Sequence, residues 1–139
     1  MQSTVANHSR HHTLGNVLRR TAKRFPHRPA IICGATSWTY VEFDDICNRV
    51  ASGFAGFGIG KGDRIAILAR NSHAFAAVRF AAARLGAVLV PINFMLNAEE
   101  VNFILGHSGA THFCLDSGLL QTARTAVNDT RVRNMFWLP

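Results

Sequence analysis

Residues 64–92 read Arg-Ile-Ala-Ile-Leu-Ala-Arg-Asn-Ser-His-Ala-Phe-Ala-Ala-Val-Arg-Phe-Ala-Ala-Ala-Arg-Leu-Gly-Ala-Val-Leu-Val-Pro-Ile. The stretch begins with an apolar run that predicts a strand. Asn71 or Ser72 then caps a helix that reaches about Leu85, and Gly86 closes it. A second apolar run ends the stretch and predicts a strand covered on both faces. A strand, a helix and a strand at this spacing predict parallel strands joined by a right-handed crossover.

The same alternation continues toward the carboxyl end. Asn97 and Glu100 form a capping pair, and the helix that they begin ends at Gly109. Three further elements are predicted, namely strands at 112–115 and 132–138 and a helix at 119–127. The whole pattern predicts an α/β fold with a doubly wound parallel sheet and alternating helices.

A helix and a hairpin are predicted before the sheet. The helix follows from an apolar stripe that Pro26 and Pro29 terminate, formed by Leu14, Val17, Leu18, Thr21 and Phe25. Strands at 30–33 and 37–40 form a short β-hairpin, and Thr39 with Glu42 is the capping box of a helix that Gly58 stops. We expect a disordered basic tail with histidines at 1–12 and one α/β subdomain at 13–139.

Composition excludes several classes of protein. Of the 139 residues 48% are hydrophobic and 17% are charged, which excludes intrinsic disorder for most of the chain. No apolar run approaches the ~18 residues that a membrane-spanning helix needs, and the first residues lack the apolar core of a secretory signal. Three cysteines, Cys33, Cys47 and Cys114, lie far apart, which argues for a reducing compartment. A cytoplasmic protein without a transmembrane segment is therefore expected.

The positive charge is concentrated at the amino end. Six of the 15 basic residues precede Glu42, and no acidic residue does. We interpret this as the solvated face of the first helix and expect no nucleic-acid partner, because no zinc-finger spacing, RNA-binding aromatic motif or basic zipper is visible. A basic nucleic-acid binder and an organelle transit peptide are the alternatives. His8, His11 and His12 are likewise an alternative metal-binding cluster within the expected tail.

Alternating glycines invite a phosphate-binding interpretation. Gly56, Gly58, Gly60 and Gly62 are followed by Asp63. A dinucleotide loop needs a Gly-x-Gly-x-x-Gly spacing between a strand and the helix after it, so that the helix N-terminus faces the phosphate. Here the spacing differs, and the glycines follow a helix and precede a strand. The pattern predicts a helix end and a tight turn.

Other candidate catalytic groups have structural explanations. Cys114 alternates with His112 and Asp116 as a nucleophile and base could on one strand face, but its apolar surroundings predict a buried, inert thiol. His73 lies in the first turn of a helix and His107 in the last turn of another. The acidic pairs Asp44-Asp45 and Glu99-Glu100 lie in first helical turns. No general acid or base is therefore assigned.

Several segments together resemble the N-terminal part of the AMP-forming acyl-CoA synthetases, which are adenylate-forming ligases. The segments, in the order and spacing of that family, are Phe25-Pro26-His27-Arg28-Pro29-Ala30-Ile31, Ser37-Trp38-Thr39-Tyr40-Val41-Glu42-Phe43, Gly58-Ile59-Gly60-Lys61-Gly62-Asp63-Arg64-Ile65-Ala66-Ile67, Asn71-Ser72, Leu85-Gly86-Ala87-Val88-Leu89-Val90-Pro91-Ile92-Asn93 and Ala98-Glu99-Glu100-Val101. The resemblance covers about residues 14–127. It places Gly62-Asp63 at a turn, Gly86 at a helix end and Pro91 at a strand end.

The resemblance implies a fatty-acid or related carboxylate substrate, with ATP, Mg²⁺ and coenzyme A as cofactors of the complete enzyme. Such enzymes make an acyl-adenylate and then an acyl-CoA thioester. They use a Ser/Thr/Gly-rich loop that ends in Pro-Lys-Gly and a lysine near the far carboxyl end. This sequence contains neither group, and its lysines are Lys23 and Lys61. No catalytic, cofactor-binding or metal-binding residue is therefore carried over to it.

The first expectation is an N-terminal fragment of an acyl-CoA synthetase, either a truncated gene product or one piece of a split enzyme, and inactive alone. A small α/β binding module that kept the scaffold is the alternative. A last strand without a following helix would leave Met135, Phe136, Trp137 and Leu138 partly uncovered. Self-association or a complementing C-terminal fragment is therefore the expected partner.

Overall fold

The computed structural model describes residues 13–139. The elements, in chain order, are α2 (Leu14–Arg24), β1 (Pro29–Cys33), β2 (Thr36–Thr39), α3 (Tyr40–Gly56), β3 (Arg64–Leu68), α4 (His73–Leu85), β4 (Val88–Ile92), α5 (Ala98–Ser108), β5 (His112–Asp116), the 3₁₀ turn η1 (Ser117–Leu119), α6 (Leu120–Ala126) and β6 (Asn134–Leu138). The predicted tail at 1–12, with its three histidines, lies outside the described residues.

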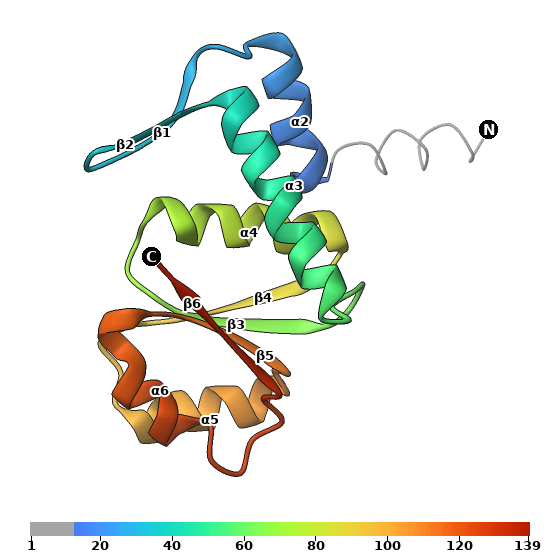
Figure 1. Cartoon of the computed structure of the whole chain (residues 1–139). Helices are drawn as coiled ribbons and strands as arrows, with labels where there is room; N and C mark the ends of the chain where they lie inside the picture. The colour runs from blue at the N-terminus through green and yellow to red at the C-terminus, as the bar shows by residue number, and fades with distance from the viewer. Residues whose placement is uncertain (1–12) are drawn as a thin grey trace, which may run out of the picture.

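A parallel sheet in the order β4-β3-β5-β6 is the centre of the fold. Figure 1 shows α4 and the end of α3 on one face of this sheet and α5 with α6 on the other. The antiparallel hairpin β1–β2 and α2 lie beyond α3 and α4. The predicted α/β fold, doubly wound and preceded by a helix and a hairpin, is confirmed.

The two central strands β3 and β5 carry the core. Ile67 and Cys114 lie opposite one another and face α3 and α4, where the neighbours include Phe54 and Val78. Alternate residues face α5 and α6, and they form a second apolar cluster that includes Ala66, Leu68, Phe113 and Leu115. The period of two along each strand divides the core into these two layers.

Two strands form the edges of the sheet, and this corrects one prediction. Residues 87–92 were expected to be covered on both faces, but β4 is an edge strand in which Val88 and Pro91 are exposed. The fully buried pattern belongs to β3 and β5 instead. A continuous apolar run is therefore compatible with an edge position, because apolarity alone does not place a strand within its sheet.

Of the predicted apolar stripe on the first helix, only Leu18 is buried. Leu14, Val17 and Phe25 are 41%, 48% and 38% exposed, while α2 buries Gly15, Leu18 and Ala22. Close packing of α2 on α4 explains why this side of α2 is buried, because a Cβ atom on Gly15 would lie only 3.2 Å from the Cα atom of Arg84 in α4. Small residues allow the two helices to approach, so α2 packs through them and leaves the larger side chains outside.

Local boundary signals agree with the structure to within a few residues. Both capping boxes form, with Thr39 accepting from the backbone N–H of Glu42 and Asn97 from that of Glu100. Ser72, and not Asn71, caps α4. Three ends shift slightly: α2 ends at Arg24, Tyr40 begins α3 although a strand was predicted there, and β6 begins at Asn134.

Candidate functional site

The strand order defines where a doubly wound sheet offers a binding crevice. From β3 the chain first moves to β4 on one side and then returns to β5 on the other. Ligands of open α/β sheets bind at such a reversal, outside the carboxyl ends of the two strands. In this chain Arg70 follows β3 and Asp116 ends β5, so these two residues face the candidate site.

Arg70 and Asp116 close this position by pairing with one another. The backbone N–H of Arg70 donates to Oδ2 of Asp116 at 3.1 Å, and its Nη1 donates to both carboxylate oxygens at 3.3 and 3.1 Å. The guanidinium carbon lies 5.5 Å from the ring centre of Phe94. A Cβ atom on Gly118 would lie 3.2 Å from Nη1 of Arg70. The pair is therefore enclosed on two sides.

Sequence reasoning did not identify this pair as a site. A signal was nevertheless present, because each residue stands at the carboxyl end of an apolar strand, where the topological rule points. The side chain of Arg70 is 58% exposed, so the ion pair contributes less than about 1 kcal/mol to stability. The arrangement joins the ends of β3 and β5, and the carboxylate of Asp116 already balances the charge of Arg70.

The glycine-rich segment has the structural role that its spacing predicts. It connects α3 to β3, with Gly58 and Gly62 at φ angles of 80° and 87°, where other residues are strained. The backbone N–H of Gly60 donates to Oδ2 of Asp63 at 2.7 Å. The N–H of Gly62 donates to the carbonyl of Gly86 at 2.9 Å, which ties this turn to the turn after α4.

The alternating His112, Cys114 and Asp116 do not form a catalytic group. Cys114 is fully buried, and burial raises the pKa of its thiol to about 12. His112 stacks on Phe136 at 6.2 Å between ring centres, and burial lowers its pKa, so the ring is neutral at pH 7. The Nδ1 atom of His112 lies 2.9 Å from the hydroxyl oxygen of Thr111 and is therefore engaged away from the thiol, so Cys114 remains a protonated, buried thiol, as the sequence predicted.

The remaining candidates are dispersed over the fold. His73 packs edge-on against Trp38 at 5.0 Å, and His107 stacks on Phe103 at 5.6 Å. Asp44 pairs with Arg84, and Asp45 pairs with Arg49 at 3.0 Å.

Over residues 13–139, no group of three or more His, Cys, Asp or Glu side chains is placed to hold a metal ion. None of the helices in the same range is long and apolar enough to span a bilayer.

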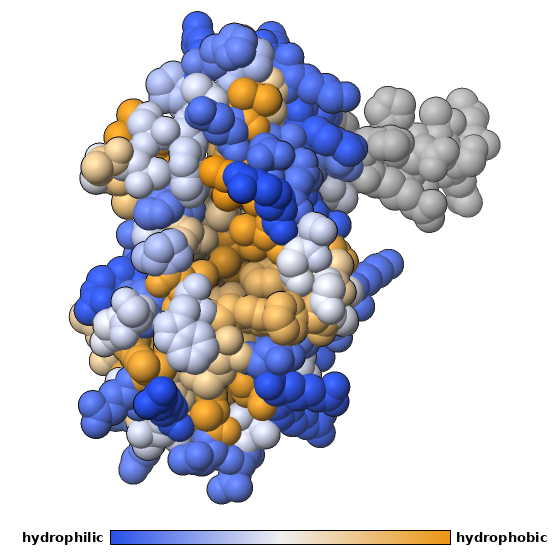
Figure 2. Space-filling view, viewed as in Figure 1, coloured by the Kyte–Doolittle hydropathy of each residue, from blue (hydrophilic) through white to orange (hydrophobic). Residues whose placement is uncertain are grey.

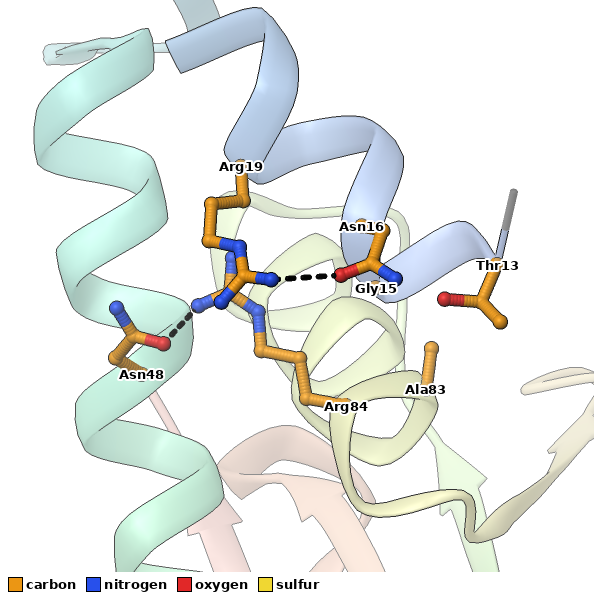
Figure 3. A pocket seen from close by; sticks show the side chains of 7 residues that line it. All are labelled: Thr13, Gly15, Asn16, Arg19, Asn48, Ala83 and Arg84. Carbon is orange, nitrogen blue, oxygen red and sulfur yellow. Dashed lines mark hydrogen bonds between the residues drawn. The ribbon is translucent and has the colours of Figure 1, made fainter. Parts of the chain in front are cut away.

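A polar pocket of about 300 Å³ lies where α2, α3 and α4 meet. Figure 3 shows Arg19 of α2 donating to Asn16 and Arg84 of α4 reaching toward Asn48 of α3. Arg84 also donates from Nη1 to the backbone carbonyl of Asp44 at 3.0 Å. These contacts join the three helices, while the Nε atom of Arg84 is buried without a hydrogen-bond partner among the described residues.

An apolar hollow of about 330 Å³ lies between the hairpin, α3, α4 and the end of β6. Its lining includes Trp38, Phe54, Val78, Phe136 and Leu138. Figure 2 shows hydrophobic side chains gathered in the middle of this side of the molecule. The nearest titratable side chain is His73, whose Nδ1 atom is buried without a hydrogen-bond partner among the described residues.

We predict that one cysteine of three reacts with a thiol reagent in the folded chain. Burial raises the pKa of Cys47 to about 12, as it does for Cys114, whereas Cys33 is only half-buried in β1. A thiol whose pKa is raised stays protonated and unreactive at pH 8. Titration with a chromogenic disulfide should count one thiol in native protein and three in denaturant. The Cys33→Ser variant should lose the native reaction, and a rapid native reaction in that variant would contradict the prediction.

Comparison with known proteins gives consistent matches. The model of the AMP-binding enzyme family matches residues 18–135. The long-chain-fatty-acid–CoA ligase FadD13 of Mycobacterium tuberculosis is 42% identical over 99 residues, which cover 70% of this chain and 20% of the relative. A feruloyl-CoA synthase of Amycolatopsis is 38% identical over 102 residues, 73% of this chain and 21% of the relative. The chain spans about a fifth of the length of the curated relatives it matches.

Solved structures match the same part of larger proteins. The N-terminal domain of FACL13 from Mycobacterium tuberculosis has a TM-score of 0.85 at 34% identity and covers 90% of this chain and 33% of that one. A fatty acyl CoA synthetase from Mycobacterium tuberculosis also has a TM-score of 0.85 at 32% identity, and the match covers 91% of this chain and 26% of that one. The arrangement of sheet, helices and hairpin is therefore that of an N-terminal domain of such proteins.

Proposed function

Because this chain belongs to the AMP-binding enzyme family, we propose that it supplies the first α/β subdomain, residues 13–139, of an AMP-forming acyl-CoA synthetase. The observation that carries the proposal is the common fold with the N-terminal domain of a fatty acyl-CoA ligase over nearly all described residues. A likeness in both sequence and fold, over the same range, supports a shared role better than either alone.

The proposed whole-enzyme reaction has two steps. A carboxylate, with a fatty acid as the proposed substrate, attacks ATP to give an acyl-adenylate and pyrophosphate. Coenzyme A then displaces AMP and forms the thioester. Mg²⁺ would balance charge on the phosphates of the complete enzyme. These cofactors are proposed for the whole enzyme and not for this subdomain.

The described residues do not fit a nucleotide by themselves. At the switch point Arg70 is already paired with Asp116, and the glycine turn precedes a strand instead of a helix. No step of the reaction is therefore assigned to a residue of this chain. Its proposed contribution is the sheet, in which the parallel pairing of β3 with β5 is supplemented at the carboxyl end by the Arg70–Asp116 pair.

A chimera tests the proposal. Residues 14–139 replace the corresponding segment of FadD13 from Mycobacterium tuberculosis, and formation of acyl-CoA is measured with a long-chain fatty acid, ATP and coenzyme A. If this chain is an equivalent scaffold, the chimera should keep activity within about tenfold of the parent, because the transferred part carries no reacting group. A folded chimera without activity would contradict the proposal.

The 139-residue chain on its own is expected to form neither acyl-AMP nor acyl-CoA. Its sequence holds no Ser/Thr/Gly-rich loop ending in Pro-Lys-Gly, so groups that stabilise developing charge on the phosphates are not supplied. ATP–pyrophosphate exchange that depends on a fatty acid measures this directly. Exchange above that of a boiled sample would show that the chain has catalytic groups of its own.

We also propose that the isolated chain self-associates until a complementing segment covers β6. This strand pairs only with β5 among the described elements, and its Trp137 is 52% exposed beside the apolar hollow. An unpaired strand edge with apolar side chains pairs readily with another chain. Light scattering at tens of micromolar should show dimers or larger species, with Trp137→Lys reducing them. A monomeric parent protein that binds no hydrophobic dye would refute this proposal and favour the self-sufficient binding module.

A further inference from the structure

The polar pocket where α2, α3 and α4 meet carries a positive charge that is not balanced. Arg19 of α2 and Arg84 of α4 both line it, and none of its lining residues is acidic. Asp44 balances the charge of Arg84 from the side of α3, whereas Arg19 has no carboxylate partner among the described residues. Figure 3 shows both guanidinium groups in the space between the three helices. The pocket therefore favours a ligand with negative charge.

The asparagines of this pocket have their acceptors occupied and their donors open. Oδ1 of Asn16 accepts from Nη2 of Arg19 at 3.0 Å, and Oδ1 of Asn48 accepts from Nη1 of Arg84. The amide nitrogens of the two asparagines, which can only donate, have no acceptor among the described residues. The two amide groups therefore call for a ligand that accepts hydrogen bonds.

Arg84 and the start of α2 add further unsatisfied donors. Nε of Arg84 has no acceptor among the described residues, although this side chain is only 12% exposed. Thr13 makes no capping hydrogen bond to α2, and the first N–H groups of a helix, such as that of Gly15, have no partner within the helix. A pocket whose unsatisfied polar groups all donate fits a ligand that is rich in acceptors.

We propose that this pocket binds a small oxyanion of the phosphate class. A phosphate group carries a charge of about −1.5 to −2 at neutral pH, and its oxygens accept from several directions. It can therefore contact Arg19, Asn16 and the start of α2 together. A carboxylate has two oxygens in one plane and would leave more of these donors open. The pocket volume of about 300 Å³ admits the ion together with water.

The proposed oxyanion site is separate from the switch point of the sheet. The pocket lies at the start of α2, the middle of α3 and the last turn of α4, whereas the switch point lies at the carboxyl ends of β3 and β5. A bound ion would join three helices through their side chains and would act on no reacting atom. Since it binds the folded chain, it should stabilise that chain in proportion to its saturation.

Calorimetric titration of the full 139-residue chain tests the proposal. Inorganic phosphate and glycerol 3-phosphate are titrated separately at constant ionic strength in chloride buffer. Inorganic phosphate should bind saturably, with one ion per chain. Tighter binding of glycerol 3-phosphate would support the site and identify a phosphate monoester as its ligand, whereas tighter binding of inorganic phosphate would identify the free ion. Saturable binding of neither compound would overturn the proposal.

Matched variants distinguish a defined site from general attraction by a basic chain. Arg19→Gln and Arg24→Gln remove the same charge from exposed positions of α2, and Arg24 does not line the pocket. Arg19→Gln should weaken phosphate binding about tenfold, because a charge-assisted hydrogen bond is lost. Arg24→Gln should change the affinity by less than about twofold. Equal losses in the two variants contradict the proposal, and circular dichroism checks that both are folded.

Thermal melting gives a second readout. Phosphate should raise the melting temperature of the parent chain and of Arg24→Gln more than chloride of the same ionic strength does, and Arg19→Gln should lose most of this difference. Phosphate also stabilises proteins in general, because it is excluded from their surface. A rise of equal size in all three proteins would therefore be this general effect and would refute the site. Neither measurement depends on the proposed ligase role.

Discussion

Replacing Phe113 by Ala is expected to lower the free energy of unfolding by about 3–5 kcal/mol. Phe113 is fully buried in the central strand β5 and is the largest fully buried side chain of the described residues. It packs in the apolar cluster formed with α5 and α6, which includes Leu105 and Ala123. Without the ring the fold buries less apolar surface. A cavity also remains, because the helices packed on the strand relax only in part.

The matched control is Phe103→Ala on α5. Phe103 is 69% exposed, so the same chemical change should alter the free energy of unfolding by no more than about 0.5 kcal/mol. Urea unfolding followed by circular dichroism measures both. A domain of ordinary stability has about 5–15 kcal/mol in total, so the Phe113 variant is expected to be marginally folded. Equal losses for the two variants would mean that β5 is not at the centre of the core.

The second large effect is expected for Arg84→Ala. The guanidinium of Arg84 is almost enclosed where α2, α3 and α4 meet, and it pairs there with the carboxylate of Asp44, with side chains only 12% and 16% exposed. Removal of the arginine leaves that carboxylate buried without a counter-charge, which costs about 3–5 kcal/mol. It also removes the Cγ atom of Arg84, which lies beside Gly15 of α2, while the backbone atoms of residue 84 at this contact remain.

Two further variants separate the causes of this loss. Arg79→Ala removes an arginine from the exposed side of the same helix and should cost no more than about 0.5 kcal/mol. Replacing Arg84 and Asp44 together by Met and Leu should restore much of the stability, because no buried charge is then left alone. If Arg84→Ala proves as mild as Arg79→Ala, the three helices are joined by apolar contacts alone.

Both predictions bear on the proposed role as a scaffold. The Phe113 variant weakens the sheet that carries the Arg70–Asp116 switch point, and the Arg84 variant weakens the attachment of α2. In the chimera with FadD13, either substitution should therefore lower the amount of folded enzyme. The activity per folded molecule should remain near that of the unsubstituted chimera, because neither residue lies at the crevice.

The amino-acid sequence by itself determined the kind and order of the elements. Thr39 with Glu42 and Asn97 with Glu100 mark helix starts through hydrogen bonds over three residues, and Gly86 and Gly109 mark helix ends through their left-handed backbone. Such signals involve residues that are neighbours along the chain, so they can be recognised in the sequence without knowledge of the tertiary structure. Neighbouring residues likewise predict that Cys114 is buried and inert and that the glycine-rich segment is a turn.

Only the tertiary structure decided which side of α2 is buried, which strands lie at the edges and which charges pair. Arg70 and Asp116 are 46 residues apart, and Arg84 and Asp44 are 40 residues apart. The order of the parallel strands depends on which side of β3 each crossover places the next strand. An apolar run in the sequence does not indicate that side. The face of α2 was settled by close approach at Gly15, a packing requirement that favours small residues over the larger apolar ones.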